Sequence, residues 1–324
     1  MKPLTENEKE LLSEMRRSKT IGVLMGGPSE ERDISLKSGA AVLTHLASSE
    51  YRVEPCDFHT EEELSTQLKE KKIELAFLAL HGRYGEDGGV QALLGSLGIP
   101  YTGSSVSASH LAFDKWASRK IFRESGLLIP EGFVLNTSKT LPALDFDFPW
   151  VVKPVCQGSS LGLSIIDHPG ELENALRSAF QHDTRVLIEK YIRGSELTVG
   201  ILGGEALPVI QILPGGRFYD YEAKYISKKT NFLIPAPIED SLTLLVQQAA
   251  LKAHEALGCE SFSRVDFLLN ERENPVILEV NTIPGLTARS LLPRACEAAG
   301  ISFLELCERM LVTAVLKEIR RIHA

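Results

Sequence analysis

The chain has 324 residues, 44% of them hydrophobic and 24% charged, an ordinary composition for a folded protein of two or three domains. Its net charge of −8, without a run of Lys or Arg, argues against nucleic acid as a partner. Five dispersed cysteines without a CxxC pair argue against a disulfide framework or a zinc site. No segment has the pattern of a membrane span or signal peptide, so we expect a cytoplasmic protein without a membrane partner.

The first hundred residues alternate between strand and helix patterns. The predicted strands are 21–25, 51–57 and 73–80, and the predicted helices are 30–46 and 61–71. Strands separated by helices of this length favour a parallel sheet with crossover helices. We expect this α/β domain to cover residues 20–105. It follows an N-terminal extension, 1–19, which reads as an extra helix without an assigned role.

The rest of the chain has an α+β pattern. A long helix is predicted over 107–124. The predictions that follow are strands at 132–135, 150–155, 163–166 and 185–191, a helix at 170–181, strands at 196–202 and 207–213, a helix at 241–257, a hairpin at 262–281 and two C-terminal helices. The polar segment 214–236 has no clear period, which is typical of functional lids or disorder. We expect two further domains, one over residues 106–192 and one over residues 193–324.

The hairpin at 262–281 carries polar residues that could form a site. Strand alternation places Arg264 and Asp266 on one face, and Glu279 and Asn281 share a face by the same rule. If these faces coincide, Asp266, Glu279 and Asn281 converge as oxygen ligands suited to Mg²⁺ shared with nucleotide phosphates. The alternative is a half-exposed hairpin whose polar residues are solvated.

Three loops are further candidates. Lys153 precedes a Gly/Ser loop that contains Ser159 and Ser160, whose amides and hydroxyls could wrap phosphates, although a flexible turn has the same composition. This loop is not a Walker A motif. Glu31 follows Gly26-Gly27 at a helix start, where glutamates are usually surface residues. His81 ends the third strand, at the sheet edge where ligands gather, and a structural histidine is the alternative.

Taken together, these residues resemble those of D-alanine–D-alanine ligases of the ATP-grasp superfamily, from about residue 21 to the last helix. The motifs that carry the resemblance are GGxSxER at 26–32, HGxxGEDG at 81–88, YTG at 101–103, DK at 114–115, KP at 153–154, GSS at 158–160, EK at 189–190, YEAKY at 221–225, RxD at 264–266, ExNTxPGxT at 279–287 and SL at 290–291. The resemblance implies an N-terminal parallel-sheet (pre-ATP-grasp) domain followed by a two-part ATP-grasp fold.

The resemblance also implies a role for each matching residue. Asp266, Glu279 and Asn281 would hold two Mg²⁺ ions, or Mn²⁺, against ATP. The residues implied for ATP are Lys115, Lys153, Ser159, Ser160, Glu189, Lys190, Ile192, Glu196 and Lys224. Glu31 and His81 would face the first D-alanine, with Glu31 binding its ammonium, and Ser290 and Leu291 would bind the carboxylate of the second. Arg264 and the Gly285 amide would stabilise the oxyanion, and Tyr225 would join Ser159 and Glu31 in a hydrogen-bond chain.

The implied activity is ATP-dependent joining of two D-alanines through an acylphosphate, for peptidoglycan synthesis, by a homodimer. Gln157 and Pro28 depart from the family pattern, in which Glu and Thr are common, at positions that are not direct ligands. Two rivals stay open at this point. A depsipeptide ligase for D-lactate is opposed by Tyr225, which such relatives usually lack. A non-catalytic ATP-grasp module is opposed by the intact metal ligands and Arg264.

Overall fold

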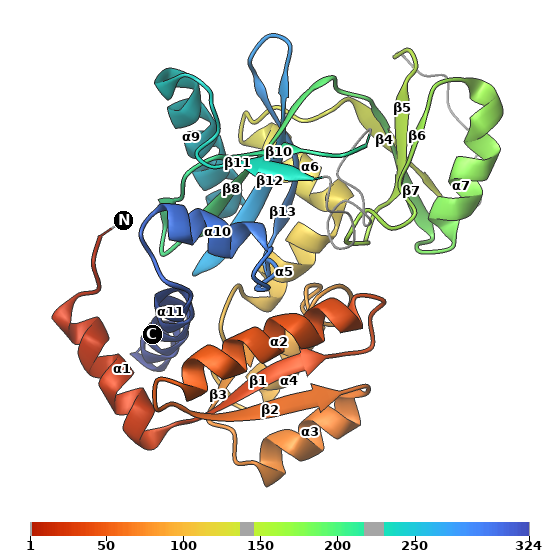
Figure 1. Ribbon diagram of the computed structural model, residues 1–324. Coiled ribbons are helices and arrows are strands. Elements are labelled where there is room, and N and C mark those ends of the chain that lie inside the picture. Colours follow the sequence, from red (N-terminus) through yellow and green to blue (C-terminus); the bar gives the residue numbers. More distant parts are fainter. Residues whose placement is uncertain (1, 137–145, 217–229, 324) are drawn as a thin grey trace.

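The computed structural model describes residues 2–136, 146–216 and 230–323. They form three sheets, which Figure 1 shows as one parallel sheet below two antiparallel sheets. The parallel sheet has the strand order β2-β1-β3. The sheet that comes second along the chain, called the middle sheet below, has the order β4-β7-β5-β6. The largest sheet has the order β11-β10-β8-β12-β13, with β9 paired to β8. Within the described residues, no helix combines the length and the apolar character that a bilayer crossing requires.

The parallel sheet forms as the alternating pattern predicts. Its strands are β1 (Thr20–Gly26), β2 (Arg52–Phe58) and β3 (Leu75–Leu78), and its helices are α2 (Arg32–Ala47), α3 (Glu61–Glu70) and α4 (Gly89–Ser96). β1 pairs in parallel with both neighbours, so the loops after β1 and β3 leave the same edge of the sheet. This edge carries the Glu31 and His81 loops toward the antiparallel sheets. The short helix α4 was not predicted.

The helix predicted over 107–124 is in fact two helices, α5 (Val106–Phe113) and α6 (Lys115–Glu124). Asp114 between them has an extended ψ of 98°, which breaks the helical path. Its carboxylate accepts hydrogen bonds from the amides of Trp116 and Ala117 at 3.0 and 2.9 Å. This N-cap starts α6 in a new direction and places Lys115 at its first turn.

The middle sheet consists of four short antiparallel strands with one helix against it. The strands are β4 (Gly132–Asn136), β5 (Trp150–Pro154), β6 (Ser164–Ile166) and β7 (Arg185–Lys190), and the helix is α7 (Leu172–Phe180) after a 3₁₀ turn at Pro169–Glu171. A small core of its own, including Trp150, Val152 and Ile188, lies between the sheet and α7. This arrangement makes the middle sheet a separate lobe, seen at the right of Figure 1.

The largest sheet contains the predicted hairpin. Its strands are β8 (Gly194–Leu202), β9 (Glu205–Ala206), β10 (Ile210–Leu213), β11 (Asn231–Leu233), β12 (Phe262–Asn270) and β13 (Pro275–Asn281), and the helices after them are α9 (Asp240–Ala256), α10 (Leu291–Ala298) and α11 (Phe303–His323). Two expectations were wrong here. The strand predicted over 207–213 is confined to β10, with β9 as a separate two-residue strand before the predicted range, and the segment 214–236 contains β11, which pairs with β10.

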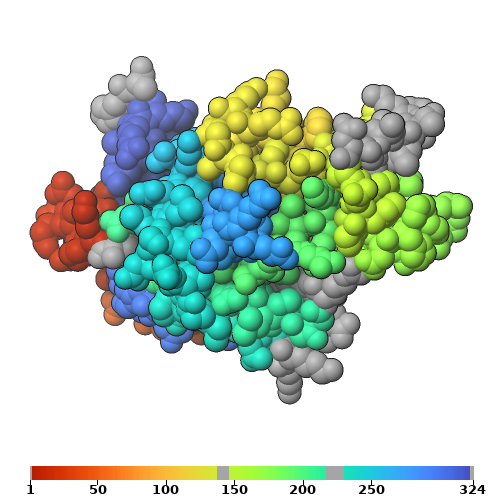
Figure 2. Space-filling view, turned by 90° about the horizontal axis from the view of Figure 1, so that it is seen from above, coloured from red at the N-terminus to blue at the C-terminus, as the bar shows by residue number. Residues whose placement is uncertain are grey.

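The N-terminal extension forms a helix, α1 (Glu6–Ser18), that packs on the last helix. Thr5 and Glu8 form a capping box at its start. Leu12 and Met15 are buried in a core that also contains residues of β1 and α11. α1 and α7 lie at opposite ends of the molecule in both overall views (Figures 1 and 2). The extension is therefore an integral part of the fold.

Candidate active site

Two cavities lie where the three sheets meet, and most of the predicted site residues line one or the other. The first, of about 330 Å³, opens between the middle and largest sheets. The predicted residues that line it are Lys115, Lys153, Ser160, Glu189, Lys190, Ile192, Glu196, Asp266 and Glu279. Apolar side chains such as Val151, Leu163 and Phe267 complete its walls. A cavity with an apolar body and a charged end suits a nucleotide.

Charged side chains at the buried end of this cavity are closely paired. Lys153 Nζ lies 2.6 Å from Glu189 Oε2, and both side chains are almost fully buried. Arg119 on α6 contacts the other oxygen of Glu189 and also donates to the Pro130 carbonyl. One carboxylate is therefore shared by two buried cations, so these three side chains together carry a net charge of +1. Sequence reasoning missed Arg119, because no motif includes it.

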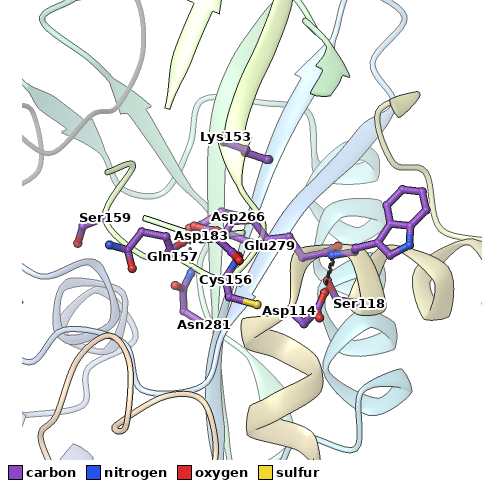
Figure 3. Close-up of polar contacts among 12 residues, drawn as sticks. Asp114, Ser118, Lys153, Cys156, Gln157, Ser159, Asp183, Asp266, Glu279 and Asn281 are labelled. Carbon is purple, nitrogen blue, oxygen red and sulfur yellow. Dashed lines mark hydrogen bonds and ion pairs between the residues drawn. The ribbon is translucent and has the colours of Figure 1, made fainter. Parts of the chain in front are cut away.

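The hairpin brings the three predicted metal ligands together, as Figure 3 shows. Asp266 and Glu279 face each other in the β12–β13 register, and Asn281 Nδ2 donates to Asp266 Oδ2 at 3.1 Å. Arg264 binds the Asp266 carboxylate through two hydrogen bonds of 2.9 and 2.7 Å. Lys115 Nζ lies 3.0 Å from Glu279. The two polar faces of the hairpin therefore coincide, as the strand alternation allowed.

This donor set fits a hard divalent cation. Two carboxylates and one amide supply oxygen ligands only, which is the chemistry that Mg²⁺ requires. No group of three His, Cys, Asp or Glu side chains with metal-binding geometry occurs in the described ranges, so the Asn281 amide is needed to complete the set. Burial disfavours the charged form of Lys115, but Glu279 outweighs this effect and raises the Lys115 pKa. The lysine therefore stays charged beside the carboxylates.

The second cavity, of about 370 Å³, lies between the parallel sheet and the largest sheet. The predicted residues that line it are Glu31, His81, Ser159, Arg264, Asn281, Gly285, Ser290 and Leu291. Arg264 and Asn281 reach it from the same hairpin whose Asp266 and Glu279 line the first cavity. The metal candidates and Arg264 thus stand at the boundary between the first cavity, with its apolar walls, and the second, which Glu31 and Arg264 line.

Glu31 is a buried carboxylate at one end of the second cavity. It precedes α2 and is 5% exposed. Ser159 Oγ, from the Gly/Ser loop after β5, donates a hydrogen bond to Glu31 Oε1. Gly158 permits this contact, because a Cβ at that position would lie 2.6 Å from Glu31 Oε2. A buried carboxylate facing a polar cavity is suited to binding an ammonium group.

His81 is buried behind Glu31 and is held by its neighbours. Its Nε2 lies 3.0 Å from Ser38 Oγ on α2, and that hydroxyl also accepts from the Leu286 amide. Burial lowers the pKa of His81 to about 4, and the nearby Arg264 adds to this effect. The imidazole is therefore neutral at pH 7. It lines the cavity as predicted and also joins α2 to the loop before α10.

The other end of the second cavity is the start of α10. Ser290 is the residue before this helix, and its Oγ accepts from the Thr287 amide at 3.0 Å. A Cβ on Gly285 would lie 2.7 Å from Ser290 Oγ, so glycine allows the Gly285 backbone to approach this hydroxyl. A helix start presents amides and a positive dipole end, which suits a carboxylate. The cavity therefore has one end for an ammonium and one for an anion.

Glu86 connects the two cavities and was not assigned a role from the sequence. It lines the second cavity and also a space of about 20 Å³ that reaches Lys115, Gln157 and Glu279. Desolvation and the Glu31 carboxylate raise the pKa of Glu86. Its position within the HGxxGEDG motif at 81–88 was the signal that could have identified it. Lys224 and Tyr225 lie outside the described residues.

The fold and the cavities define a class of protein. Two antiparallel sheets enclose a cavity that receives Lys153 from one sheet and paired carboxylates from the other, and a parallel-sheet unit completes the second cavity. This is the ATP-grasp architecture. Residues 57–104 match the family model for the D-ala D-ala ligase N-terminus, and residues 128–312 match the model for its C-terminus. The chain belongs to the D-alanine–D-alanine ligase family.

Individual relatives agree with this assignment. D-alanine–D-alanine ligases of Citrifermentans bemidjiense and Syntrophotalea carbinolica are 48% and 45% identical to the chain, with 93% of the chain and 98% of each relative covered. The ATP complex of the Bacillus anthracis D-alanine–D-alanine ligase superposes with a TM-score of 0.84 at 35% identity, covering 94% of this chain and 100% of that one. The VanG D-Ala:D-Ser ligase of Enterococcus faecalis gives 0.77 at 28% identity, covering 92% and 99%.

Proposed function

We propose that the protein joins two D-alanines with ATP, through an acylphosphate, and so supplies the dipeptide for peptidoglycan synthesis. The observation that carries this proposal is the junction of the two cavities. Arg264, Asp266, Glu279 and Asn281 project from one hairpin to the boundary between two cavities. The first has apolar walls and a charged end, and the second has Glu31 at one end and the start of α10 at the other. Phosphoryl transfer requires positioning and charge neutralisation, which these side chains can supply.

The first cavity would hold ATP. Lys115 and Lys153 neutralise the phosphates, Ser159 and Ser160 close over them, and Glu189 accepts from the adenine amino group. Lys190, Ile192 and Glu196 bind the rest of the nucleoside, and Lys224 belongs to the same proposed set. Asp266, Glu279 and Asn281 would hold Mg²⁺, two ions in the proposed state, which would stabilise charge on the transferred phosphoryl group.

The second cavity would hold both D-alanines. Glu31 binds the ammonium of the first, whose carboxylate then points toward the hairpin, and His81 supports this end. Ser290 and Leu291 bind the carboxylate of the second D-alanine, whose amine attacks the carbonyl of the acylphosphate and displaces inorganic phosphate. Arg264 and the Gly285 amide stabilise the oxyanion that forms. Tyr225, with Ser159 and Glu31, would close the site against water, which otherwise hydrolyses an acylphosphate.

The same proposal includes an organisation of the chain and its setting. Residues 20–105 would form the substrate domain, 106–192 the central ATP-grasp domain and 193–324 the catalytic ATP-grasp domain, with 1–19 as an extension. The separate core of the middle sheet and the matches at 57–104 and 128–312 support this division. We place the enzyme in the cytoplasm, as a homodimer, where its substrates ATP and D-alanine occur.

One assay tests the activity. ADP release and dipeptide formation are measured with Mg-ATP and D-alanine, and compared with L-alanine, with D-alanine plus D-lactate and with D-alanine plus D-serine. We expect D-alanyl-D-alanine as the main product and no ADP release with L-alanine. The D-serine arm matters because a D-Ala:D-Ser ligase is among the structural relatives. Preferential formation of a mixed product, or ADP release without a dipeptide, would contradict the proposal.

A further inference from the structure

Beside the first cavity, which Gln157 also lines, a third group of contacts joins the loop after β1 to the loop after β5. Gln157 Nε2 donates to Glu30 Oε2 at 2.8 Å, and His182 Nδ1 lies 3.3 Å from the same oxygen. Arg83, from the loop after β3, donates to the His182 carbonyl at 2.7 Å and to the Cys156 carbonyl at 3.4 Å. Glu30, Arg83, Gln157 and His182 line an open cleft of about 390 Å³ that also reaches Glu31.

Gln157 is held on two sides. Its carbonyl accepts from Lys115 Nζ at 2.7 Å, and its side chain binds Glu30. In the view of Figure 3, it lies between Ser159 and the Asp266–Glu279 pair. Glu30 and Glu31 are neighbours in the first loop, and Gln157 and Ser159 are two residues apart in the second. The contact between Glu30 and Gln157 therefore lies beside the contact between Glu31 and Ser159.

The backbone after Gln157 depends on such anchors. Ser159 and Ser160 have φ values of 51° and 59°, in the left-handed region that non-glycine residues rarely adopt. Such residues persist where surrounding contacts fix the backbone. Lys115 and Glu30 hold the loop before the two serines, and Glu31 holds Ser159 itself. Loss of the Glu30 contact would leave the start of the loop with fewer restraints.

We propose that Glu30 and Gln157 are a matched pair of positioning residues that dock the Gly/Ser loop on the parallel sheet and so bring Ser159 to Glu31. A carboxylate and an amide are complementary, because Gln157 donates and Glu30 accepts. A glutamate at 157 would place two carboxylates in contact here. This role rests on the proposed function, and it concerns the order of the loop rather than any chemical step.

The experiment is a charge swap. The variants are Glu30→Gln, Gln157→Glu and the double variant, with Gln181→Glu as the matched control, because Gln181 is exposed in the same cleft. We expect Gln157→Glu to lower kcat/KM for the first D-alanine about tenfold and to raise the ratio of ADP to dipeptide. The KM for ATP should also rise, because the same loop carries Ser159 and Ser160, which close over the phosphates in the proposed function. The double variant should recover to within about threefold of wild type.

A second measurement does not depend on turnover. Hydrogen–deuterium exchange of amides 156–162 in the free protein should be faster in Gln157→Glu and return toward wild type in the double variant. Multiplicative losses in the double variant, or a Gln181→Glu effect as large as that of Gln157→Glu, would overturn the pairing. If wild-type protein makes no dipeptide, the proposed function fails. The exchange data then still decide whether Glu30 and Gln157 hold the loop.

Discussion

Glu31 is a buried carboxylate that accepts a hydrogen bond from the Ser159 hydroxyl, and its proposed ligand is a cation. Glu31→Gln keeps the size of the side chain and removes the charge. We expect the KM for the first D-alanine to rise about 10- to 100-fold, since a charge-assisted contact in a closed site contributes a few kcal/mol. The KM for ATP should change by less than about threefold, because a carboxylate does not favour phosphates. Steady-state kinetics with each substrate varied separately distinguish the two, and equal changes would contradict the assignment.

The hairpin carboxylates give a second test at this scale. Asp266→Asn, Glu279→Gln and Asn281→Ala each remove one proposed ligand from an oxygen-only set. We expect each variant to bind Mn²⁺ at least about tenfold more weakly in the presence of ATP, measured by the electron paramagnetic resonance signal of the free ion. Circular dichroism should show an unchanged fold. A variant with wild-type Mn²⁺ affinity would remove that residue from the metal site.

The contact of Arg119 with Glu189 is a feature of the site that could not be predicted from the sequence. Asp266, Glu279 and Asn281 were predictable because strand alternation places polar side chains on one face of a hairpin. Glu31 and His81 lie at the loops after β1 and β3, where a parallel sheet places its ligands. Arg119 is one basic residue of an amphipathic helix, and its contact with Glu189 depends on how α6 lies against the middle sheet. No local pattern in the sequence encodes that approach.

Among the elements, α1 offers the most direct test of stability. Leu12 is 4% exposed in the core shared with β1 and α11, and Arg16 forms a 2.5 Å ion pair with Glu308. Leu12→Ala should lower the free energy of unfolding by about 2–4 kcal/mol, through lost burial and the cavity left behind. Glu10→Ala on the exposed side of α1 is the control and should have little effect. Urea unfolding checks both, and equal stability of the two variants would show that α1 is not part of the core.

The elements also show where periodicity is insufficient. The apolar pattern continues across Asp114, so it predicts a single helix over 107–124. The structure breaks at this residue because its carboxylate caps α6 and pairs with Arg185 at 2.7 Å. Asp is a strong N-cap, but the same residue also occurs on the exposed side of continuous helices. β11 was missed because it is only three residues long and a polar segment separates it from its partner β10, so no periodic pattern marks it.

For the whole molecule, two buried histidines predict a loss of stability in acid. Burial lowers the pKa of His81 and of His254 to about 4, from an ordinary value near 6.5. As the pH falls below about 6.5, the unfolded chain binds protons that the folded protein does not accept until about pH 4. Each histidine can therefore lower the free energy of unfolding by up to about 1.4 kcal/mol per pH unit in this window, and neither contributes above it.

His254 allows this effect to be isolated, because it lies away from both cavities and bonds Ser263 Oγ through Nδ1 at 2.7 Å. His254→Gln should give a shallower fall in unfolding free energy between pH 6.5 and 4.5 than wild type. Urea unfolding at several pH values measures the slope. His110→Gln, at an exposed position of α5, is the control and should follow the wild-type slope. An unchanged slope in His254→Gln would contradict the burial effect.

For the molecule as a whole, the sequence predicted the parallel sheet, the α+β region after it and the hairpin, but it did not predict how the sheets pack against one another. Period-two patterns determine which side chains share a face within a strand. They do not determine that the middle sheet faces the largest sheet across a cavity, because that packing depends on contacts between distant segments, such as Lys115 with Glu279. The family motifs indicated this arrangement, and the cavities give it a physical basis.

The packing of α11 affects how the chain is made. Its residues Met310 and Leu311 share one core with Ile21 and Phe77 of the parallel sheet. On a ribosome, the sheet emerges about 200 residues before α11, a delay of roughly 10–40 s at ordinary rates of synthesis. During that time the nascent sheet lacks its native cover and exposes apolar surface of the kind that chaperones bind. The parallel sheet, which is synthesised early, can therefore complete its native packing only after α11 has been synthesised.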